Sequence, residues 1–203
     1  MKITIIGAGN VGRTLGAAAQ RAGHRVTYLV RDTTGARALT ATGASITPGP
    51  VERDSDLVML ATPADANADA LRAAGDLTGM VLVDCTNPLK PELLLSVGFT
   101  DSGGEQTARL ARGARVVKAF NTIGYPVMAS PTLGGRKAFL PVVGDDAHAK
   151  ARVIDFAKQI GFDAVDAGPL IKARLTEPFA ALWISLAYDR GFGPDFAFSL
   201  IRR

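Results

Sequence analysis

The chain has 203 residues, of which 47% are hydrophobic and 21% are charged, and its net charge at pH 7 is +4. This composition supplies enough apolar side chains for one or two packed domains and excludes an intrinsically disordered chain. The basic excess is small and is not gathered into runs. It therefore suits an anionic cofactor but does not indicate nucleic-acid binding.

Three observations concern the compartment in which the protein works. The single cysteine, Cys85, excludes an internal disulfide and is typical of a reducing environment. The first apolar run begins at Lys2, which leaves no room for a signal peptide. The uncharged stretch at residues 178–188 is too short to span a bilayer. We therefore expect a cytoplasmic protein with no membrane partner.

The first predicted strand, residues 2–6, runs into the pattern Gly7-x-Gly9-x-x-Gly12, and a helix pattern over residues 11–22 follows directly. Gly7 permits the tight turn, Gly9 lets a pyrophosphate approach the backbone, and Gly12 lets the helix pack closely on the strand. The free N–H groups at the helix N-terminus then face the phosphates. This order predicts a dinucleotide-binding turn; the alternative is a glycine-rich turn that binds nothing.

The second predicted strand, residues 25–30, ends where dinucleotide sites distinguish NAD from NADP. An NAD site has Asp or Glu here to accept a hydrogen bond from the ribose 2′-OH, but this position is Val30. The next residue, Arg31, offers a guanidinium that can pair with the 2′-phosphate of NADP. Asp32 would repel that phosphate, so we expect its carboxylate to turn away and cap a helix beginning near Thr33. The pattern favours NADP; the alternative is that Arg31 is a solvated loop residue.

The remaining elements continue the alternation of strand and helix. Further strands are predicted at residues 44–47, 56–61, 80–84, 115–120, 138–143 and 163–166, and further helices at 33–42, 64–74, 103–111, 146–160 and 177–188. Most of the strands are continuously apolar, as in sheets that are covered on both faces. We therefore predict an α/β protein with a doubly wound, mainly parallel sheet. The last helix is so apolar that it either seals the core or faces a second subunit.

Small polar residues follow three consecutive predicted strands. Thr62 and Pro63 follow the fourth strand, Asn87 follows the fifth, and Asn121 and Thr122 follow the sixth. Ligands of doubly wound sheets bind at these carboxyl ends. Thr62 and Asn87 could bind the ribose or amide of a nicotinamide nucleotide, and Asn121 and Thr122 could orient a hydride acceptor. The alternative is that all of them are ordinary turn residues.

The usual acid–base residues are poorly placed for catalysis. His24 is expected at the opposite edge of the sheet, and His148 early in a polar helix. Lys118 could donate a proton, but a structural lysine is favoured, and Cys85 resembles a core residue more than a redox thiol. We find no cluster with metal-ligand spacing. Carbonyl reduction normally requires a proton donor, whereas hydride transfer between two cofactors needs mainly alignment and exclusion of water, so the sequence favours the second chemistry.

A series of ordered motifs resembles a known family. The motifs are the glycine loop, DCTNPL at residues 84–89, SGGEQ at 102–106, VKAFNTI at 117–123, VGDD at 143–146, DAGPL at 166–170, and then Glu177-Pro178 and Leu182-Trp183. They span essentially the whole chain. They look like the NADPH-dependent F420 reductase family, also called coenzyme F420:NADP oxidoreductase-like, and resemble the cytosolic domain of six-transmembrane ferric reductases.

The resemblance implies a Rossmann NADP-binding domain over residues 1–145 and a C-terminal α/β extension over 146–203, with a small helical part and a dimer contact. It implies hydride exchange between NADP(H) and coenzyme F420 or a flavin. Carried over by motif, the pyrophosphate would be held by Gly7, Gly9, Asn10, Val11 and Gly12, the 2′-phosphate by Arg31, the nicotinamide side by Thr62 and Pro63, and the acceptor side by Asn121, Thr122 and Ile123. The chain departs from the family at Val30, often a small polar residue, and at residues 120–123, which replace a histidine-containing loop.

Three functions are compatible with these residues. The favoured one is an NADP-dependent oxidoreductase whose small-molecule acceptor is a deazaflavin or flavin, acting as a homodimer. The second is an NADPH-dependent reductase of a small imine or ketone that uses Lys118 or a bound water as proton donor. The third is a non-catalytic NADP(H)-binding module.

Overall fold

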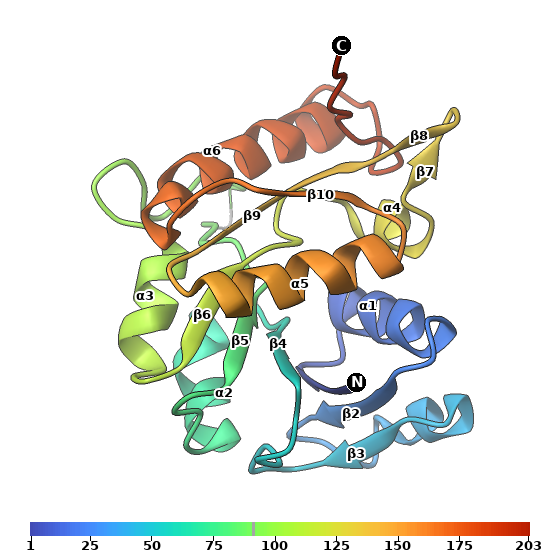
Figure 1. The fold of residues 1–203 in the computed structure, drawn as a ribbon, viewed down its shortest axis with the longest axis vertical. Coiled ribbons are helices and arrows are strands. Elements are labelled where there is room, and N and C mark those ends of the chain that lie inside the picture. The colour runs from blue at the N-terminus through green and yellow to red at the C-terminus, as the bar shows by residue number, and fades with distance from the viewer. Residues whose placement is uncertain (91) are drawn as a thin grey trace.

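Residues 1–90 and 92–203 are described by a computed structural model, and within them eight strands form one twisted sheet (Figure 1). The strands are β1 (Lys2–Ile6), β2 (Arg25–Leu29), β3 (Ser45–Thr47), β4 (Leu57–Leu60), β5 (Val81–Asp84), β6 (Arg115–Lys118), β9 (Phe139–Gly144) and β10 (Asp163–Asp166). Their order is β10-β9-β6-β5-β4-β1-β2-β3. The strands from β3 to β6 run parallel, β9 is antiparallel to β6, and β10 is parallel to β9. The predicted mainly parallel, Rossmann-type sheet is confirmed.

Helices cover both faces of this sheet. They are α1 (Asn10–Arg21), α2 (Asn67–Ala74), α3 (Gly103–Leu110), α4 (Tyr125–Ala129), α5 (Ala147–Gln159) and α6 (Ala173–Ile184). Helices α1 and α5 lie on the face turned to the viewer in Figure 1, and α2 and α3 lie behind the sheet. In the described part of the chain, none of the helices has the length and apolarity needed to cross a membrane.

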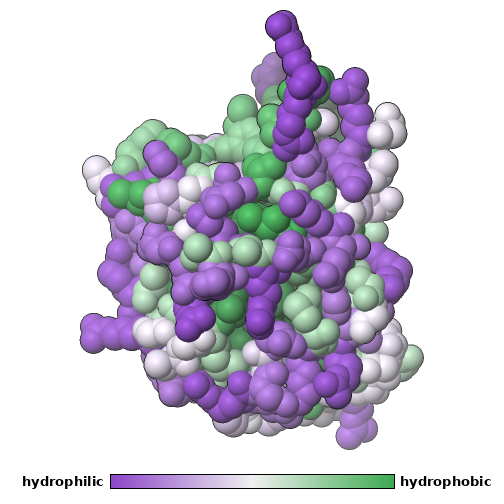
Figure 2. Space-filling view, in the orientation of Figure 1, coloured by the Kyte–Doolittle hydropathy of each residue, from purple (hydrophilic) through white to green (hydrophobic). Residues whose placement is uncertain are grey.

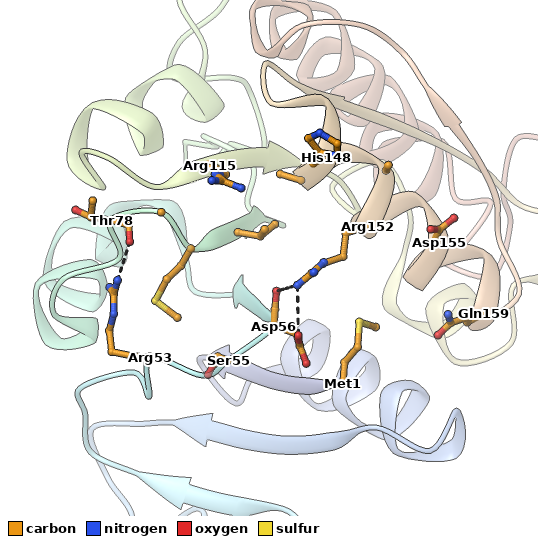
Figure 3. Close-up of a pocket in the computed structure, with 15 residues that line it drawn as sticks. Met1, Arg53, Ser55, Asp56, Thr78, Arg115, His148, Arg152, Asp155 and Gln159 are labelled. Atoms are coloured by element: carbon orange, nitrogen blue, oxygen red, sulfur yellow. Dashed lines mark hydrogen bonds and ion pairs between the residues drawn. The ribbon is translucent and has the colours of Figure 1, made fainter.

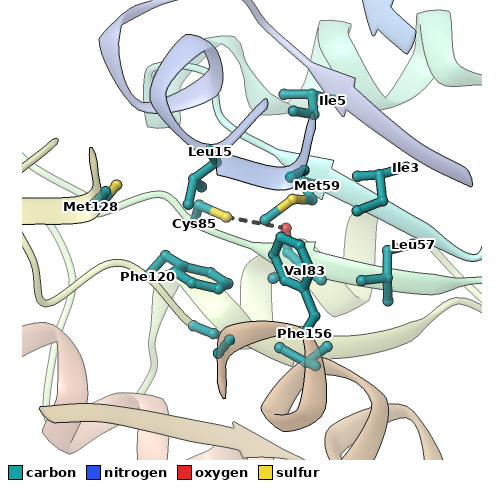
Figure 4. Packing of buried hydrophobic residues seen from close by; sticks show 14 of the residues in the cluster. Ile3, Ile5, Leu15, Leu57, Met59, Val83, Cys85, Phe120, Met128 and Phe156 are labelled. Atoms are coloured by element: carbon teal, nitrogen blue, oxygen red, sulfur yellow. Dashed lines mark hydrogen bonds between the residues drawn. The ribbon is translucent and has the colours of Figure 1, made fainter. Parts of the chain in front are cut away.

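The core consists of two apolar layers, one on each face of the sheet. Alternate residues of β1 and β4, such as Ile3, Ile5 and Met59, pack with Leu15 of α1 and Phe156 of α5 (Figure 4). Their neighbours on the same strands point the other way, into a second cluster that includes Ile6, Val58 and Leu60. Because both faces are buried, the strands carry continuous apolar runs rather than alternating ones.

The single cysteine lies inside the first of these layers. The Cys85 thiol is buried and donates a hydrogen bond to the carbonyl oxygen of Val83 at 3.8 Å (Figure 4). Burial and the neighbouring charge of Asp84 raise the pKa of this thiol far above its ordinary value. The side chain is therefore placed as a core residue.

The helix predicted over residues 33–42 is wrong in its first half. Only a 3₁₀ helix at Arg37–Thr42 is present. The Asp32 carboxylate accepts hydrogen bonds from the backbone N–H groups of Thr34 at 2.9 Å and Gly35 at 3.1 Å. These bonds close a tight turn in place of the first helical turn, because Asp side chains compete for nearby backbone donors.

The C-terminal helix also differs from its predicted bounds. Helix α6 begins at Ala173 rather than at Glu177, and Pro178 lies inside it. The helix continues at Ser185–Asp189 as one π-helical turn. The structure also contains elements that were not predicted, among them α4 and the hairpin of β7 (Thr132–Leu133) and β8 (Arg136–Lys137).

Candidate functional site

A cavity of about 540 Å³ lies at the carboxyl ends of the parallel strands, where the strand order reverses between β1 and β4. Its walls come from the turns after β1, β2 and β4 and from one face of α2. The residues that line it include Gly7, Gly9, Arg13, Arg31, Thr62 and Pro63. The predicted dinucleotide turn, the predicted phosphate-binding arginine and the predicted nicotinamide-side residues are thus brought together in one cavity.

Glycine is present at three positions of the turn, and the reason differs from one position to the next. Gly7 has φ +101°, and an added Cβ would lie 2.7 Å from the carbonyl oxygen of Ala61. A Cβ on Gly12 would collide with the carbonyl oxygen of Gly7, so this glycine allows α1 to pack on the turn. Gly9 has an ordinary φ of −76°, and an added Cβ would meet no described atom within 4 Å. The protein's own packing therefore does not require a glycine at position 9. A ligand that lies close to this backbone would require one, because a Cβ would occupy its space.

The N-terminus of α1 opens onto the same cavity. Gly9 is its N-cap residue, and no side chain in the described part of the chain caps the helix. Its first N–H groups and the positive end of the helix dipole are therefore available to an anion. Asn10 is exposed at this end, whereas Val11 packs partly against the core. Arg13, which the sequence analysis missed, adds a guanidinium whose Nε donates to the carbonyl oxygen of Ala8 at 2.7 Å.

The end of β2 supplies the second cation. Arg31 is exposed and lines the cavity beside the turn. The expected conflict with Asp32 is reduced, since its carboxylate is directed to the backbone N–H groups of its own turn. A guanidinium here is free to pair with a phosphate on an adenosine ribose.

One wall of the cavity was not predicted. Ala66, Asp69, Ala70 and Ala73 line it from α2 and the turn before it. Their spacing of three and four residues places them on one helix face, and three of the four are alanine. This pattern of small residues after the fourth strand was the available signal for a wall built mainly of alanine, with the carboxylate of Asp69 on it.

Asn87, predicted to bind the ribose or amide of the nucleotide, and the predicted acceptor-side residues are not among the residues that line this cavity; they lie at the ends of β5 and β6. Asn87 donates from Nδ2 to the carbonyl oxygen of Asn121 at 2.7 Å, and Asn121 donates from Nδ2 to Asn87 Oδ1 at 3.2 Å. Thr122 and Ile123 are buried beside them. Within the described residues, Asn121 Oδ1, Thr122 Oγ1 and Thr176 Oγ1 are buried without a hydrogen-bond partner. Such groups are costly, which marks this region as a candidate polar site.

Lys118 is held in a buried ion network instead of extending to solvent as a snorkelling lysine would. Its side chain is 0% exposed, and Nζ lies 3.0 Å from Asp84 Oδ2 and 3.0 Å from Glu177 Oε1. It also donates to the carbonyl oxygen of Thr86 at 2.8 Å. Burial alone would lower the pKa of the ammonium, but the two carboxylates outweigh this effect and raise the pKa above its ordinary value. A proton held this firmly is not available to a substrate.

A second cavity of about 600 Å³ lies at the opposite edge of the sheet (Figure 3). It is lined by Met1, by residues at the starts of β5 and β6, and by the exposed face of α5 that carries His148 and Arg152. Arg152 pairs with Asp56 there at 3.3 Å. His24 also lies near this edge, where its ring contacts Gln159 at 3.0 Å. Both histidines therefore lie at the edge of the sheet opposite the glycine turn, where His24 was predicted to lie.

Comparison with known proteins identifies the family. The family described as "NADP oxidoreductase coenzyme F420-dependent" matches residues 2–88. A protein from Arthrobacter sp. FB24, provisionally assigned as an F420-dependent NADP reductase, has 33% identity and a TM-score of 0.88, with 100% of both chains covered. The chain belongs to the F420-dependent NADP oxidoreductase family.

Two further proteins are similar to this chain. The metalloreductase STEAP3 of Rattus norvegicus is 29% identical over 178 residues, which are 87% of this chain and 36% of that protein. This chain thus spans about a third of that relative. A reductive aminase from Aspergillus terreus in complex with NADPH has 22% identity and a TM-score of 0.69, with 94% of this chain and 63% of that one covered. That likeness shows the shared fold alone.

The cavity fits the NADP(H) of the F420-dependent NADP oxidoreductases. The open space over Gly9, the uncapped N-terminus of α1 and the guanidinium of Arg31 lie where a pyrophosphate and an extra phosphate would be bound. NADPH supplies a hydride when bound, and the chain's own contribution is to hold and orient it.

The glycine turn gives a matched pair of variants. We expect Gly9→Ala to lower the free energy of unfolding by about 1 kcal/mol or less and to weaken NADPH binding at least about tenfold, because the methyl group displaces the pyrophosphate from the helix N-terminus. Gly12→Ala should instead lower the free energy of unfolding by about 2 kcal/mol or more through its collision with Gly7. Urea unfolding and calorimetry check both values. A Gly9→Ala protein that binds NADPH like the wild type would contradict the assignment.

Proposed function

We propose that this chain transfers a hydride between NADP(H) and a deazaflavin or flavin acceptor, with coenzyme F420 as the first candidate. The observation that carries the proposal is the contrast between the two sides of the carboxyl edge. One side offers a glycine turn, an uncapped helix and two guanidinium groups for a phosphorylated dinucleotide. The other offers the amide and hydroxyl groups of Asn121 and Thr122, and the lysine buried beneath them, Lys118, is held by Asp84 and Glu177.

The proposed roles are given in the spatial order of the strands, from β2 through β1, β4 and β5 to β6. Arg31 binds the 2′-phosphate, and the backbone of Gly7, Gly9, Asn10, Val11 and Gly12 binds the pyrophosphate. Thr62 and Pro63 lie at the nicotinamide side, and Asn87, at the end of β5, binds the ribose or amide. Asn121, Thr122 and Ile123 form the acceptor side, and they orient the acceptor and exclude water rather than moving a proton.

The competing proposal, reduction of a small imine or ketone, requires a proton donor next to the hydride. The side chain considered for this role, Lys118, is fully buried and engaged by Asp84, Glu177 and Thr86. Lys118 is therefore not available as the proton donor of an imine or ketone reductase. A hydride acceptor that equilibrates its proton with solvent, such as a deazaflavin or flavin, fits the site better.

An acceptor screen tests the proposal directly. Purified protein is mixed with NADPH and F420, FMN, a cyclic imine or no acceptor, and NADPH oxidation is followed by absorbance. We expect turnover with F420 or FMN and none with the imine. Imine turnover would establish the competing activity. Tight NADPH binding without turnover of any acceptor would support a binding module instead.

The choice of NADP over NAD depends on Arg31. We expect Arg31→Ala to raise the dissociation constant of NADPH at least about tenfold and to leave that of NADH nearly unchanged, because a charge-assisted bond to the 2′-phosphate is lost. Arg25→Ala, at the exposed start of the same strand, is the matched control and should change neither. Equal weakening of both nucleotides would refute the phosphate role of Arg31.

We also propose that the protein is a homodimer that covers the outer face of α6. Leu175 and Leu182, seven residues apart on α6, are 63% and 52% exposed and lie on one helix face, and Ile171, in the 3₁₀ helix (Leu170–Lys172) just before α6, is 48% exposed. By contrast, the surface viewed in Figure 2 is mainly hydrophilic, with hydrophobic residues in small separate patches.

Light scattering at micromolar concentration checks this arrangement. The wild type should have the mass of a dimer, and Leu175→Glu should be monomeric because its charge would be buried at the contact. Leu110→Glu, at a site of similar exposure on α3, should remain dimeric. A monomeric wild type would rule the dimer out.

A further inference from the structure

We propose that Thr62 Oγ1 accepts a hydrogen bond from the nicotinamide half of the bound nucleotide, and that Asn67, Thr86 and Asp84 are positioning residues that enforce this direction. The donor would be a ribose hydroxyl or the carboxamide N–H group. The inference rests on the proposed NADP(H) function. It specifies which chemical groups of the nucleotide the cavity wall can bind at Thr62 and which groups it repels.

Of these four residues, Thr62 is the one that lines the cavity. It lines the cavity directly after β4, and its methyl group lies 3.1 Å from the position of a Cβ on Gly7. It therefore stands next to the pyrophosphate turn, on the side towards β5. Asn67 and Thr86 are 6% and 5% exposed and lie behind this wall.

A continuous chain of hydrogen bonds runs inward from Thr62. Its hydroxyl is 2.8 Å from Asn67 Oδ1, and Asn67 Nδ2 is 3.2 Å from Thr86 Oγ1. Thr86 Oγ1 is in turn 2.7 Å from Asp84 Oδ1, which also accepts from the backbone N–H of Thr86 at 2.9 Å. The other carboxylate oxygen of Asp84 faces Lys118 and the hydroxyl of Thr107 at 3.0 and 3.1 Å.

The charge at the inner end fixes the direction of every bond in this chain. Asp84 faces an ammonium and acts as a carboxylate, which can only accept hydrogen bonds. The single hydroxyl proton of Thr86 is therefore donated to Asp84, and its lone pairs must accept from Asn67 Nδ2. The amide of Asn67 is thereby oriented with Oδ1 towards Thr62, so the hydroxyl of Thr62 donates inward.

Thr62 consequently presents only lone pairs to the cavity. A hydroxyl or amide N–H group on the ligand can donate to it, whereas a phosphate or carboxylate oxygen would meet an acceptor and be rejected. This polarity matches the second ribose and the carboxamide of NADP(H) and places the phosphates on the other side of Gly7. It also gives the buried Lys118 network a role at the site without any contact with the ligand.

Two probes separate this role from a general effect on the fold. NADPH carries the nicotinamide half, whereas adenosine 2′,5′-bisphosphate carries only the adenosine half, with its 2′-phosphate and its 5′-phosphate. We expect Thr62→Val and Thr86→Val each to raise the dissociation constant of NADPH roughly three- to tenfold, as for one lost neutral hydrogen bond. Both should leave adenosine 2′,5′-bisphosphate within about twofold of the wild type, and Thr86→Ser should restore NADPH binding.

A double-mutant cycle shows whether Thr86 acts through Thr62. The variant with both valines should bind NADPH no more weakly than Thr62→Val alone, because the second change then has nothing left to position. Additive losses, or equal weakening of the two probes, would mean that Thr86 is merely structural and would overturn the inference. If Thr86→Val does not fold, Asn67→Ala takes its place in the cycle.

The outcomes also separate this inference from the proposed function. A wild type that binds no NADPH overturns both. A wild type that binds NADPH, with Thr62→Val unchanged, overturns the acceptor role of Thr62 and leaves the proposed function intact. The 3-acetylpyridine analogue of NADPH, which lacks the carboxamide N–H donors, should show the loss at Thr62→Val only if the ribose is the donor.

Discussion

A buried ammonium held between two carboxylates connects the sheet to the C-terminal helix. Lys118 on β6 faces Asp84 on β5 and Glu177 on α6, and Glu177 also accepts the N–H groups of Gly103 and Gly104 at the start of α3. An uncompensated charge in this interior would cost several kcal/mol, so all four elements must be in place together. Charge pairing, in addition to apolar packing, therefore fixes the position of α6 relative to the carboxyl ends of β5 and β6.

The same network shapes the chemistry at the carboxyl edge. It holds Lys118 away from substrate, which removes this proton donor from the acceptor side. Through Asp84 it also sets the order of donors and acceptors that ends at Thr62. A site built in this way contributes alignment and selective hydrogen bonding, and leaves the redox chemistry to its ligands.

The sequence predicted the parts of the molecule that depend on local pattern. The strands were found because burial on both faces leaves continuous apolar runs, and the glycine turn because strand, glycines and helix follow one another directly. The β7–β8 hairpin was missed although Gly134-Gly135 between two short strands is a local turn signal. The ion-pair partners of Lys118 could not be predicted from the sequence, since residues 84, 118 and 177 are brought together only by the register of the sheet and the packing of α6.

The position of the single cysteine has a practical consequence for studying this protein. Cys85 is enclosed by the core, and its thiol is held in the protonated form, which is the unreactive one. A cysteine introduced on the surface would therefore be the main target of a thiol-directed dye or spin label, without prior removal of the native residue. Distances between the two halves of the nucleotide cleft can then be followed in solution on an otherwise unaltered chain.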